Sequence, residues 1–181
     1  MNEIEINQKW FTPLFNATQI NNRIDELAAE MNTTLRHQNP LFVVVLGGAY
    51  IFAADLLRKI TVAHEVTFVK INSYHGTKSS GKINLSLSPA IALQGRHVIF
   101  IEDIIDSGLS MEFLLAYGTT FKPLTQQVVT LLFKPKALKT TIVPNWVGFE
   151  IEPAFVLGYG LDFDEKGRNL PHIYVETEPI K

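Results

Sequence analysis

Cysteine is absent from the 181 residues of this chain. Disulfide bonds, cysteine-bound zinc and a thiol nucleophile are therefore excluded, and the composition is typical of a reducing compartment. The first ten residues, MNEIEINQKW, lack the cationic and apolar segments of a signal peptide, and no apolar run reaches the length of a membrane span. We therefore expect a cytoplasmic protein with no membrane attachment.

An excess of positive charge is also missing. The chain holds 16 basic and 18 acidic residues, and the basic residues are scattered along it. Because proteins that bind nucleic acid gather Lys and Arg on one face, we expect no nucleic-acid partner. Apolar residues make up 46% and charged residues 19% of the chain, which is ordinary for a compact folded protein, and residues 1–181 suit one domain.

Several common active-site motifs are lacking as well. Gly47-Gly48-Ala49 fits neither the dinucleotide-binding pattern nor the phosphate-binding loop of nucleoside triphosphatases, and a tight turn is an equally good interpretation of this pair. The histidines show no metal-ligand spacing, and no serine lies in the nucleophile motif Gly-x-Ser-x-Gly. Zinc-dependent and serine-dependent hydrolysis therefore have no support in the sequence.

What the sequence does contain is an alternation of apolar strands and amphipathic helices. Apolar residues recur at helical spacing from Ile20 to Met31, behind Thr18 as the expected N-cap. Strands are expected at 41–46, 65–71, 83–87, 98–101 and 127–133, with helices at 49–60 and 109–117 and short strands within 146–151 and 154–160. Val- and Ile-rich strands that alternate with helices predict an α/β fold: a mainly parallel, twisted sheet with helices on both faces.

Two stretches depart from this alternation. The late C-terminal region is rich in Gly and aromatic residues, which predicts a small separate lobe beside the sheet. The segment NSYHGTKSSGK, residues 72–82, has almost nothing to bury and predicts a mobile loop.

The stretch IFIEDIIDSGLS, residues 99–110, combines two features that seldom occur together. A buried strand ends in acidic and small polar residues: Glu102, Asp103, Asp106, Ser107, Gly108 and Ser110. Free N–H groups at a helix start bind phosphate, whereas carboxylates bind Mg²⁺ and sugar hydroxyls. Helix capping by Asp106 or Ser107 is the alternative, but capping needs only one such residue. The loop therefore predicts a phosphorylated sugar as ligand, together with Mg²⁺.

This loop, IEDIIDSGLS, resembles the motif with which type I phosphoribosyltransferases bind 5-phosphoribosyl-1-pyrophosphate (PRPP). Together with VLGGAYIFAADLL, INSYHGTKSSG, LLFKPKALK and VGFEIEPAFVLGYGLDFDEKGRNLP, it resembles the hypoxanthine-guanine phosphoribosyltransferases over residues 41–175. The resemblance implies a type I phosphoribosyltransferase fold with a hood built from parts of the N-terminus and the C-terminal region. It implies Mg²⁺-dependent purine salvage, in which PRPP and hypoxanthine or guanine give IMP or GMP and pyrophosphate, by a homodimer or homotetramer.

The resemblance also implies how the donor is held. Glu102 and Asp103 would approach the ribose hydroxyls and Mg²⁺. The 5′-phosphate would lie on the loop formed by Asp106, Ser107, Gly108, Leu109 and Ser110. Pyrophosphate would contact Gly47, Gly48 and Arg168, and Ser73 and Tyr74 would belong to a lid. The same resemblance implies that the Leu46–Gly47 peptide can be cis when ligand is bound.

The purine site is implied in the same way. Asp106 would be the catalytic acid/base at purine N7, and Lys134 would donate to the 6-oxo oxygen. Phe155 would stack on the base and Val156 would meet its edge. Asp162 would bind on the purine side and hold a second Mg²⁺.

Two positions depart from many relatives, which carry Lys or Arg at Gly47 and Lys at Ala154. The choice among hypoxanthine, guanine and xanthine therefore stays open. Two alternatives remain: a phosphoribosyltransferase for xanthine or another base, and a regulator that senses PRPP or a nucleotide without turnover. A regulator would be expected to show a basic nucleic-acid face or to lack Asp106, and the sequence shows neither.

Overall fold

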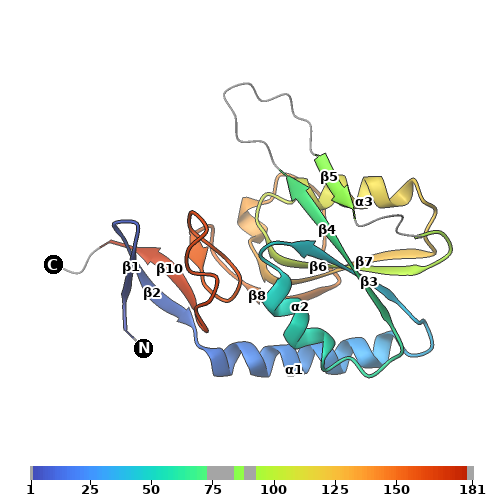
Figure 1. Ribbon diagram of the computed structural model, residues 1–181, viewed down its shortest axis with the longest axis horizontal. Helices are drawn as coiled ribbons and strands as arrows, with labels where there is room; N and C mark the ends of the chain where they lie inside the picture. Colours follow the sequence, from blue (N-terminus) through green and yellow to red (C-terminus); the bar gives the residue numbers. More distant parts are fainter. Residues whose placement is uncertain (1, 73–83, 88–92, 179–181) are drawn as a thin grey trace.

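The computed structural model describes residues 2–72, 84–87 and 93–178, which form two sheets and three α-helices (Figure 1). The larger sheet has the strand order β5-β4-β3-β6-β7-β8. Its strands are β3 (Leu41–Leu46), β4 (Glu65–Asn72), β5 (Asn84–Leu87), β6 (His97–Ile105), β7 (Thr125–Phe133) and β8 (Trp146–Glu150). All of them run parallel except β5, which pairs antiparallel with β4 at one edge.

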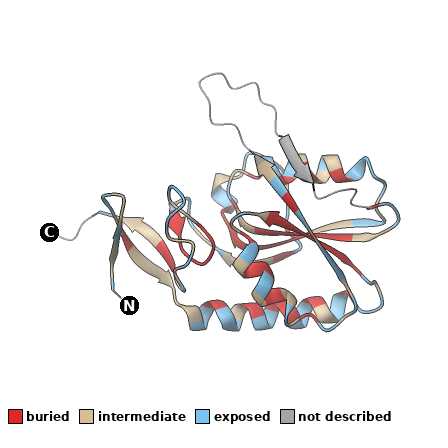
Figure 2. Ribbon diagram, viewed as in Figure 1, coloured by how far each residue is buried: buried red, intermediate tan, exposed pale blue. Residues whose placement is uncertain are grey.

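Helices cover both faces of this sheet, as predicted. Helices α1 (Ala17–Thr34) and α2 (Tyr50–Leu57) pack on one face, and α3 (Leu109–Thr119) packs on the other (Figure 1). Strand β4 is exposed at most of positions 65–71, whereas the central strands β3, β6 and β7 are buried along most of their length (Figure 2). Burial on both faces explains why these strands are continuous apolar runs in the sequence. The expected α/β class is confirmed.

The start of α1 differs from the expectation. Asn16, not Thr18, is the N-cap: its side chain accepts from the N–H of Gln19, and the Gln19 side chain accepts from the N–H of Asn16. This reciprocal capping box satisfies two donors that a helix otherwise leaves unpaired. The predicted apolar stripe from Ile20 to Met31 is buried. Among the described residues, no helix is long and apolar enough to cross a membrane.

The smaller sheet, called the hood from here on, joins the two ends of the chain. Its strand order is β1-β2-β10-β9, and every pair is antiparallel. The strands are β1 (Ile4–Ile6), β2 (Lys9–Phe15), β9 (Val156–Leu157) and β10 (Ile173–Thr177). The expected lobe therefore exists, but the sequence patterns did not predict β1, β2 or β10.

The segment that was expected to form a mobile loop lies almost wholly outside the described residues. This includes Ser73 and Tyr74, the two residues of the expected lid.

Candidate active site

The carboxyl ends of the parallel strands gather most of the predicted site residues at one edge of the large sheet. Gly47 and Gly48 follow β3, Glu102 and Asp103 lie near the end of β6, and Lys134 follows β7. This edge is where ligands bind in open parallel sheets. A cavity of about 280 Å³ lies there, lined by Val45, Leu46, Gly47, Gly48, Ile71, Glu102, Asp103, Ile104, Ser110, Asp162 and Arg168.

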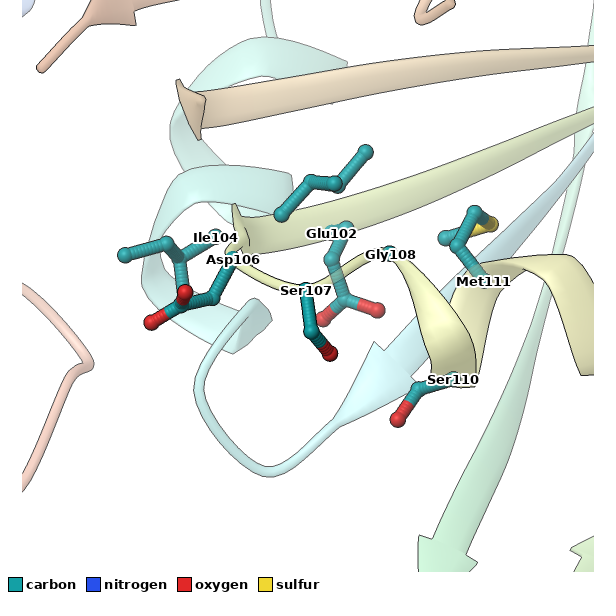
Figure 3. A pocket seen from close by; sticks show the side chains of 8 residues that line it. Glu102, Ile104, Asp106, Ser107, Gly108, Ser110 and Met111 are labelled. Carbon is teal, nitrogen blue, oxygen red and sulfur yellow. The ribbon is translucent and has the colours of Figure 1, made fainter. Parts of the chain in front are cut away.

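Beside it, the loop between β6 and α3 lines a second hollow of about 110 Å³. Figure 3 shows the side chains of Glu102, from β6, and Ser107, from the loop, projecting to the same side. The N-cap of α3 is Gly108, at φ 79°, and no side chain caps the helix. Capping by Asp106 or Ser107 is therefore wrong, and the first N–H groups of α3 have no side-chain acceptor there. Such groups form an anion-binding site.

The position of Gly108 depends on a neighbouring segment. The N–H of Lys139 donates to the carbonyl of Ser107 over 2.9 Å. A Cβ atom at Gly108 would lie 2.4 Å from Oγ1 of Thr140. The loop thus combines a positive φ with a close contact, and both require glycine. By contrast, the Leu109 side chain is 48% exposed and lines neither hollow, so that residue can contribute only its backbone.

Glu102 and Asp103 form an acidic pair at the boundary between the two hollows. Glu102 is 9% exposed. Burial raises the pKa of both carboxyls, and the negative charge of Asp103 raises the pKa of Glu102 further. Arg168 acts in the opposite direction on the pKa of Asp103. A buried pair that resists ionisation has the electrostatics of a site that gains from a bound cation.

Lys134 and Asp106 form an ion pair of 2.6 Å between Nζ and Oδ2. The Lys134 side chain is 7% exposed and that of Asp106 is 56% exposed, so a buried ammonium meets a carboxylate at the surface. The N–H of Lys134 also donates to the carbonyl of Ile105 over 2.9 Å. The neighbouring strands β6 and β7 therefore bring together Asp106 and Lys134, the residues predicted to contact N7 and the 6-oxo oxygen of the purine.

Phe155 and Val156 lie in the hood. The Phe155 ring is 41% exposed and packs against Phe11 and Phe163, with ring centroids 6.2 and 5.4 Å away. Phe11 is fully buried, so Phe155 rests on the hood core with part of its surface free. Val156 is buried in β9 opposite Val175. The sequence patterns did not single out Phe11 or Phe163, although both lie in segments rich in aromatic residues.

Arg168 extends over the Gly47–Gly48 turn. Its Nη1 donates to the carbonyl of Gly160 over 2.9 Å, and its Nη2 lies 2.9 Å from Asp162 Oδ1. A Cβ atom at Gly47 would lie 4.0 Å from Arg168 Nη1. The Leu46–Gly47 peptide is cis. The three residues predicted to contact pyrophosphate are thus together.

Asp162 is grouped with Arg168 rather than with the acidic pair. Its second carboxylate oxygen accepts from the N–H of Glu165 over 2.8 Å. Within residues 2–72, 84–87 and 93–178, no three His, Asp or Glu side chains come together as a metal site. The roles expected for Asp162 at the purine and at a second Mg²⁺ therefore stay predictions.

Comparisons with known proteins agree with this geometry. Residues 14–164 match the phosphoribosyl transferase domain family. The chain is 40% identical over 163 residues to a hypoxanthine-guanine phosphoribosyltransferase of Bacillus subtilis, covering 90% of this chain and 91% of the relative. It is 40% identical over 168 residues to a hypoxanthine-guanine-xanthine phosphoribosyltransferase of Tritrichomonas foetus, covering 92% of both chains. A crystal structure of a hypoxanthine-guanine phosphoribosyltransferase from Bacillus anthracis superimposes with a TM-score of 0.85 at 35% identity, covering 92% of this chain and 97% of that one.

Proposed function

Because this chain belongs to the phosphoribosyl transferase family, we propose that it transfers the 5-phosphoribosyl group of PRPP to hypoxanthine or guanine in purine salvage. IMP or GMP and pyrophosphate are the products. The observation that carries this proposal is the ion pair between Lys134 and Asp106, next to the loop at the uncapped start of α3 and to an acidic cavity. The family alone would leave the base undetermined.

The ion pair supports a 6-oxopurine as the acceptor. Such a base carries an oxygen acceptor at C6 beside N7, and the protein offers an ammonium donor beside a carboxylate acceptor. Lys134 would donate to the 6-oxo oxygen, while Asp106 would accept or return the proton at N7. The amino group of adenine would instead point a donor at the ammonium of Lys134. The partly exposed face of Phe155 would stack on the base, and the backbone of Val156 would meet its edge.

The donor would bind across both hollows. The 5′-phosphate would lie on the uncapped N–H groups at the start of α3 and on the hydroxyls of Ser107 and Ser110. Pyrophosphate would lie on the Gly47–Gly48 backbone under Arg168. As the bond at C1 breaks, negative charge grows on pyrophosphate and positive charge grows on the sugar. Fixed donors on one side and carboxylates on the other suit this separation, which is the form of electrostatic stabilisation that usually contributes most.

The residues of the acidic pair fit Mg²⁺. They offer two carboxylates whose pKa values are raised by burial, and Mg²⁺ prefers one or two carboxylates together with substrate phosphates. Glu102 and Asp103 would hold the ion. When bound, it supplies positive charge beside the pyrophosphate oxygens. Asp162 would be available to a second ion only after its pairing with Arg168 opens.

A spectrophotometric assay with PRPP and Mg²⁺ tests the proposal, with hypoxanthine, guanine, xanthine and adenine supplied separately. We expect nucleotide from hypoxanthine or guanine and none from adenine. Lys134→Ala should lose most of the activity toward the oxo-bases. If only xanthine is converted, the acceptor is xanthine and not hypoxanthine or guanine. PRPP binding without conversion of any base would favour a regulator instead.

We keep two further predictions as part of this proposal. A homodimer or homotetramer can be checked by light scattering of the purified protein. A cytoplasmic location is the compartment expected for a chain without cysteine.

A further inference from the structure

We propose that Tyr159 and Asp55 are positioning residues that hold Arg168 over the Gly47–Gly48 turn and thereby set the affinity for pyrophosphate. The inference rests on the proposed function, because pyrophosphate is a product of that reaction. Neither residue lines the cavity that contains Arg168. Their effect on the ligand would therefore pass through the loop that carries Arg168.

Tyr159 makes a side-chain hydrogen bond to Asp55 and has an unusual backbone conformation. It is 6% exposed and has φ 51°, a value that few residues other than glycine adopt. Its hydroxyl donates to Asp55 Oδ2. Burial and the Asp55 carboxylate raise the pKa of Tyr159 far above its ordinary value, so the phenol stays a donor at every working pH. A donor bound to a carboxylate forms one of the stronger kinds of hydrogen bond.

The next residue, Gly160, connects this contact to Arg168. The carbonyl of Gly160 accepts from Arg168 Nη1, and the N–H of Gly160 donates to the backbone carbonyl of Arg168, each over 2.9 Å. Gly160 also touches the opposite loop, because a Cβ atom there would lie 2.2 Å from the carbonyl oxygen of Gly48. The segment of Tyr159 and Gly160 therefore helps to place the guanidinium of Arg168, together with the carboxylate of Asp162.

Asp55 anchors the hydroxyl of Tyr159 to helix α2. It belongs to α2, which begins at Tyr50, directly after the Gly47–Gly48 turn and Ala49. The α2 helix thus connects the turn that would bind pyrophosphate to the residue that anchors Tyr159. The contacts close a ring that runs from Gly47 through α2 and Asp55 to Tyr159, and from there to Arg168 above Gly47. Breaking the ring at the phenol would loosen Arg168 relative to the turn without removing any group that touches the ligand.

A purely structural role would lower the melting temperature without favouring one ligand over another. The test therefore measures the Kd of magnesium pyrophosphate by calorimetry, and the KM values of PRPP and hypoxanthine, for Tyr159→Phe and Asp55→Ala. We expect each variant to weaken pyrophosphate binding and to raise the KM of PRPP by about tenfold, with the KM of hypoxanthine within about twofold. Asp55→Ala also removes an ion pair with the exposed Arg58 side chain, whereas Tyr159→Phe breaks only the shared hydrogen bond. The double variant should therefore be no worse than Asp55→Ala alone. Asp55→Asn keeps an oxygen acceptor and should restore most of the affinity.

Thr130→Val is the matched control. Its hydroxyl is also buried and donates to a backbone carbonyl, that of Leu132 over 2.9 Å, but it lines neither hollow. It should lower the melting temperature without changing the pyrophosphate Kd. The positioning role is overturned if Tyr159→Phe and Asp55→Ala both bind pyrophosphate as the unaltered protein does, or weaken both ligands equally. If the unaltered protein neither binds pyrophosphate nor forms nucleotide from PRPP, the proposed function fails and this inference fails with it.

Discussion

The two sides of the cavity are built in different ways. On the side where the 5′-phosphate is expected, called the phosphate side, one continuous stretch from Glu102 in β6 to Ser110 in α3 carries nearly every polar group. On the side where pyrophosphate is expected, called the pyrophosphate side, the Gly47–Gly48 turn meets a loop near the other end of the chain. The hydrogen bond between Tyr159 and Asp55 connects that loop to α2 and joins residues 104 positions apart. The first side therefore follows from a local motif, whereas the second exists only in the folded protein.

The largest effect should come from the local side. Asp106→Asn keeps the size of the side chain but removes the proton acceptor, so kcat should fall by roughly 10²–10⁴-fold while PRPP binding is kept. Steady-state kinetics and calorimetry with PRPP measure the two quantities. Glu112→Gln, at an exposed acid in the first turn of α3, is the control and should change neither. Near-normal turnover of Asp106→Asn would remove this residue from the chemistry.

The pyrophosphate side should be most sensitive to backbone crowding. In Gly160→Ala, the new Cβ would lie 2.2 Å from the Gly48 carbonyl oxygen, at φ +99°. Overpacking and the disfavoured φ together should lower the free energy of unfolding by about 2–4 kcal/mol and weaken pyrophosphate binding.

Gly95→Ala separates the two causes of that loss. Gly95 also has a positive φ, +68°, but a Cβ there would meet nothing within 4 Å. It should cost only about 1 kcal/mol and leave pyrophosphate binding unchanged. Equal losses in denaturant unfolding of the two variants would mean that the contact between the loops contributes nothing.

Removing the exposed aromatic ring of the hood should have an effect of intermediate size on nucleotide affinity. Phe155→Ala removes the face on which the purine would stack, and nucleotide affinity should fall by about 1–3 kcal/mol. Titration with IMP or GMP gives the value, with Phe121→Ala as the control at a phenylalanine of similar exposure, 36% against 41%. Similar losses in both variants would show that the stacking face is elsewhere.

Without a bound ligand, the buried acidic pair should lower the stability of the folded protein. Because the pKa of Glu102 is raised in the folded state, its contribution to stability is complete below the ordinary carboxyl pKa and is lost as pH rises through the raised value. Without Mg²⁺ and PRPP, Glu102→Gln should therefore melt above the unaltered protein at pH 8, and this advantage should shrink toward pH 4. Calorimetry measures the melting temperatures of both proteins from pH 4 to pH 8. A difference in melting temperature that does not vary with pH would contradict a raised pKa of Glu102.

The smallest effect is expected at Gly47. If backbone groups hold pyrophosphate, Gly47→Lys should change the Kd of pyrophosphate by less than about tenfold, equivalent to ~1.4 kcal/mol. Nearby Arg168 already supplies a guanidinium there. Much tighter binding by the variant would reveal that the site lacks a cation.

The same contrast explains which parts of the molecule could be predicted from sequence. The strand and loop around Glu102 were predictable because an apolar run followed by Gly and Ser is a local signal. Strands β1 and β2 are short and mixed in polarity, and they become strands only by pairing with each other and with β10. Thr18 was wrong as a cap because Gln19 pairs with Asn16, a choice that depends on backbone geometry.

The site residues also divide into those with a local sequence signal and those whose contacts exist only in the folded protein. The resemblance assigned the residues that would touch ligands, and the cavity gathers many of them, although their roles remain predictions until the variants are measured. It assigned no role to Tyr159 or Asp55, whose contact no spacing in the sequence indicates. Residues that act through a distant partner have no local pattern.

The pairing of β2 with β10 sets an order of events during synthesis. Residues 10–15 can pair with residues 173–177 only after the latter have been made, and among the paired strands this pairing spans the largest sequence separation. On the ribosome, the parallel strands β3, β6 and β7 all emerge before β10 is translated. The nascent chain can thus assemble the loop between β6 and α3 while the hood sheet beside Phe155 is still incomplete. The proposed purine site would therefore be the last part of the active site to form, after β10 has left the ribosome.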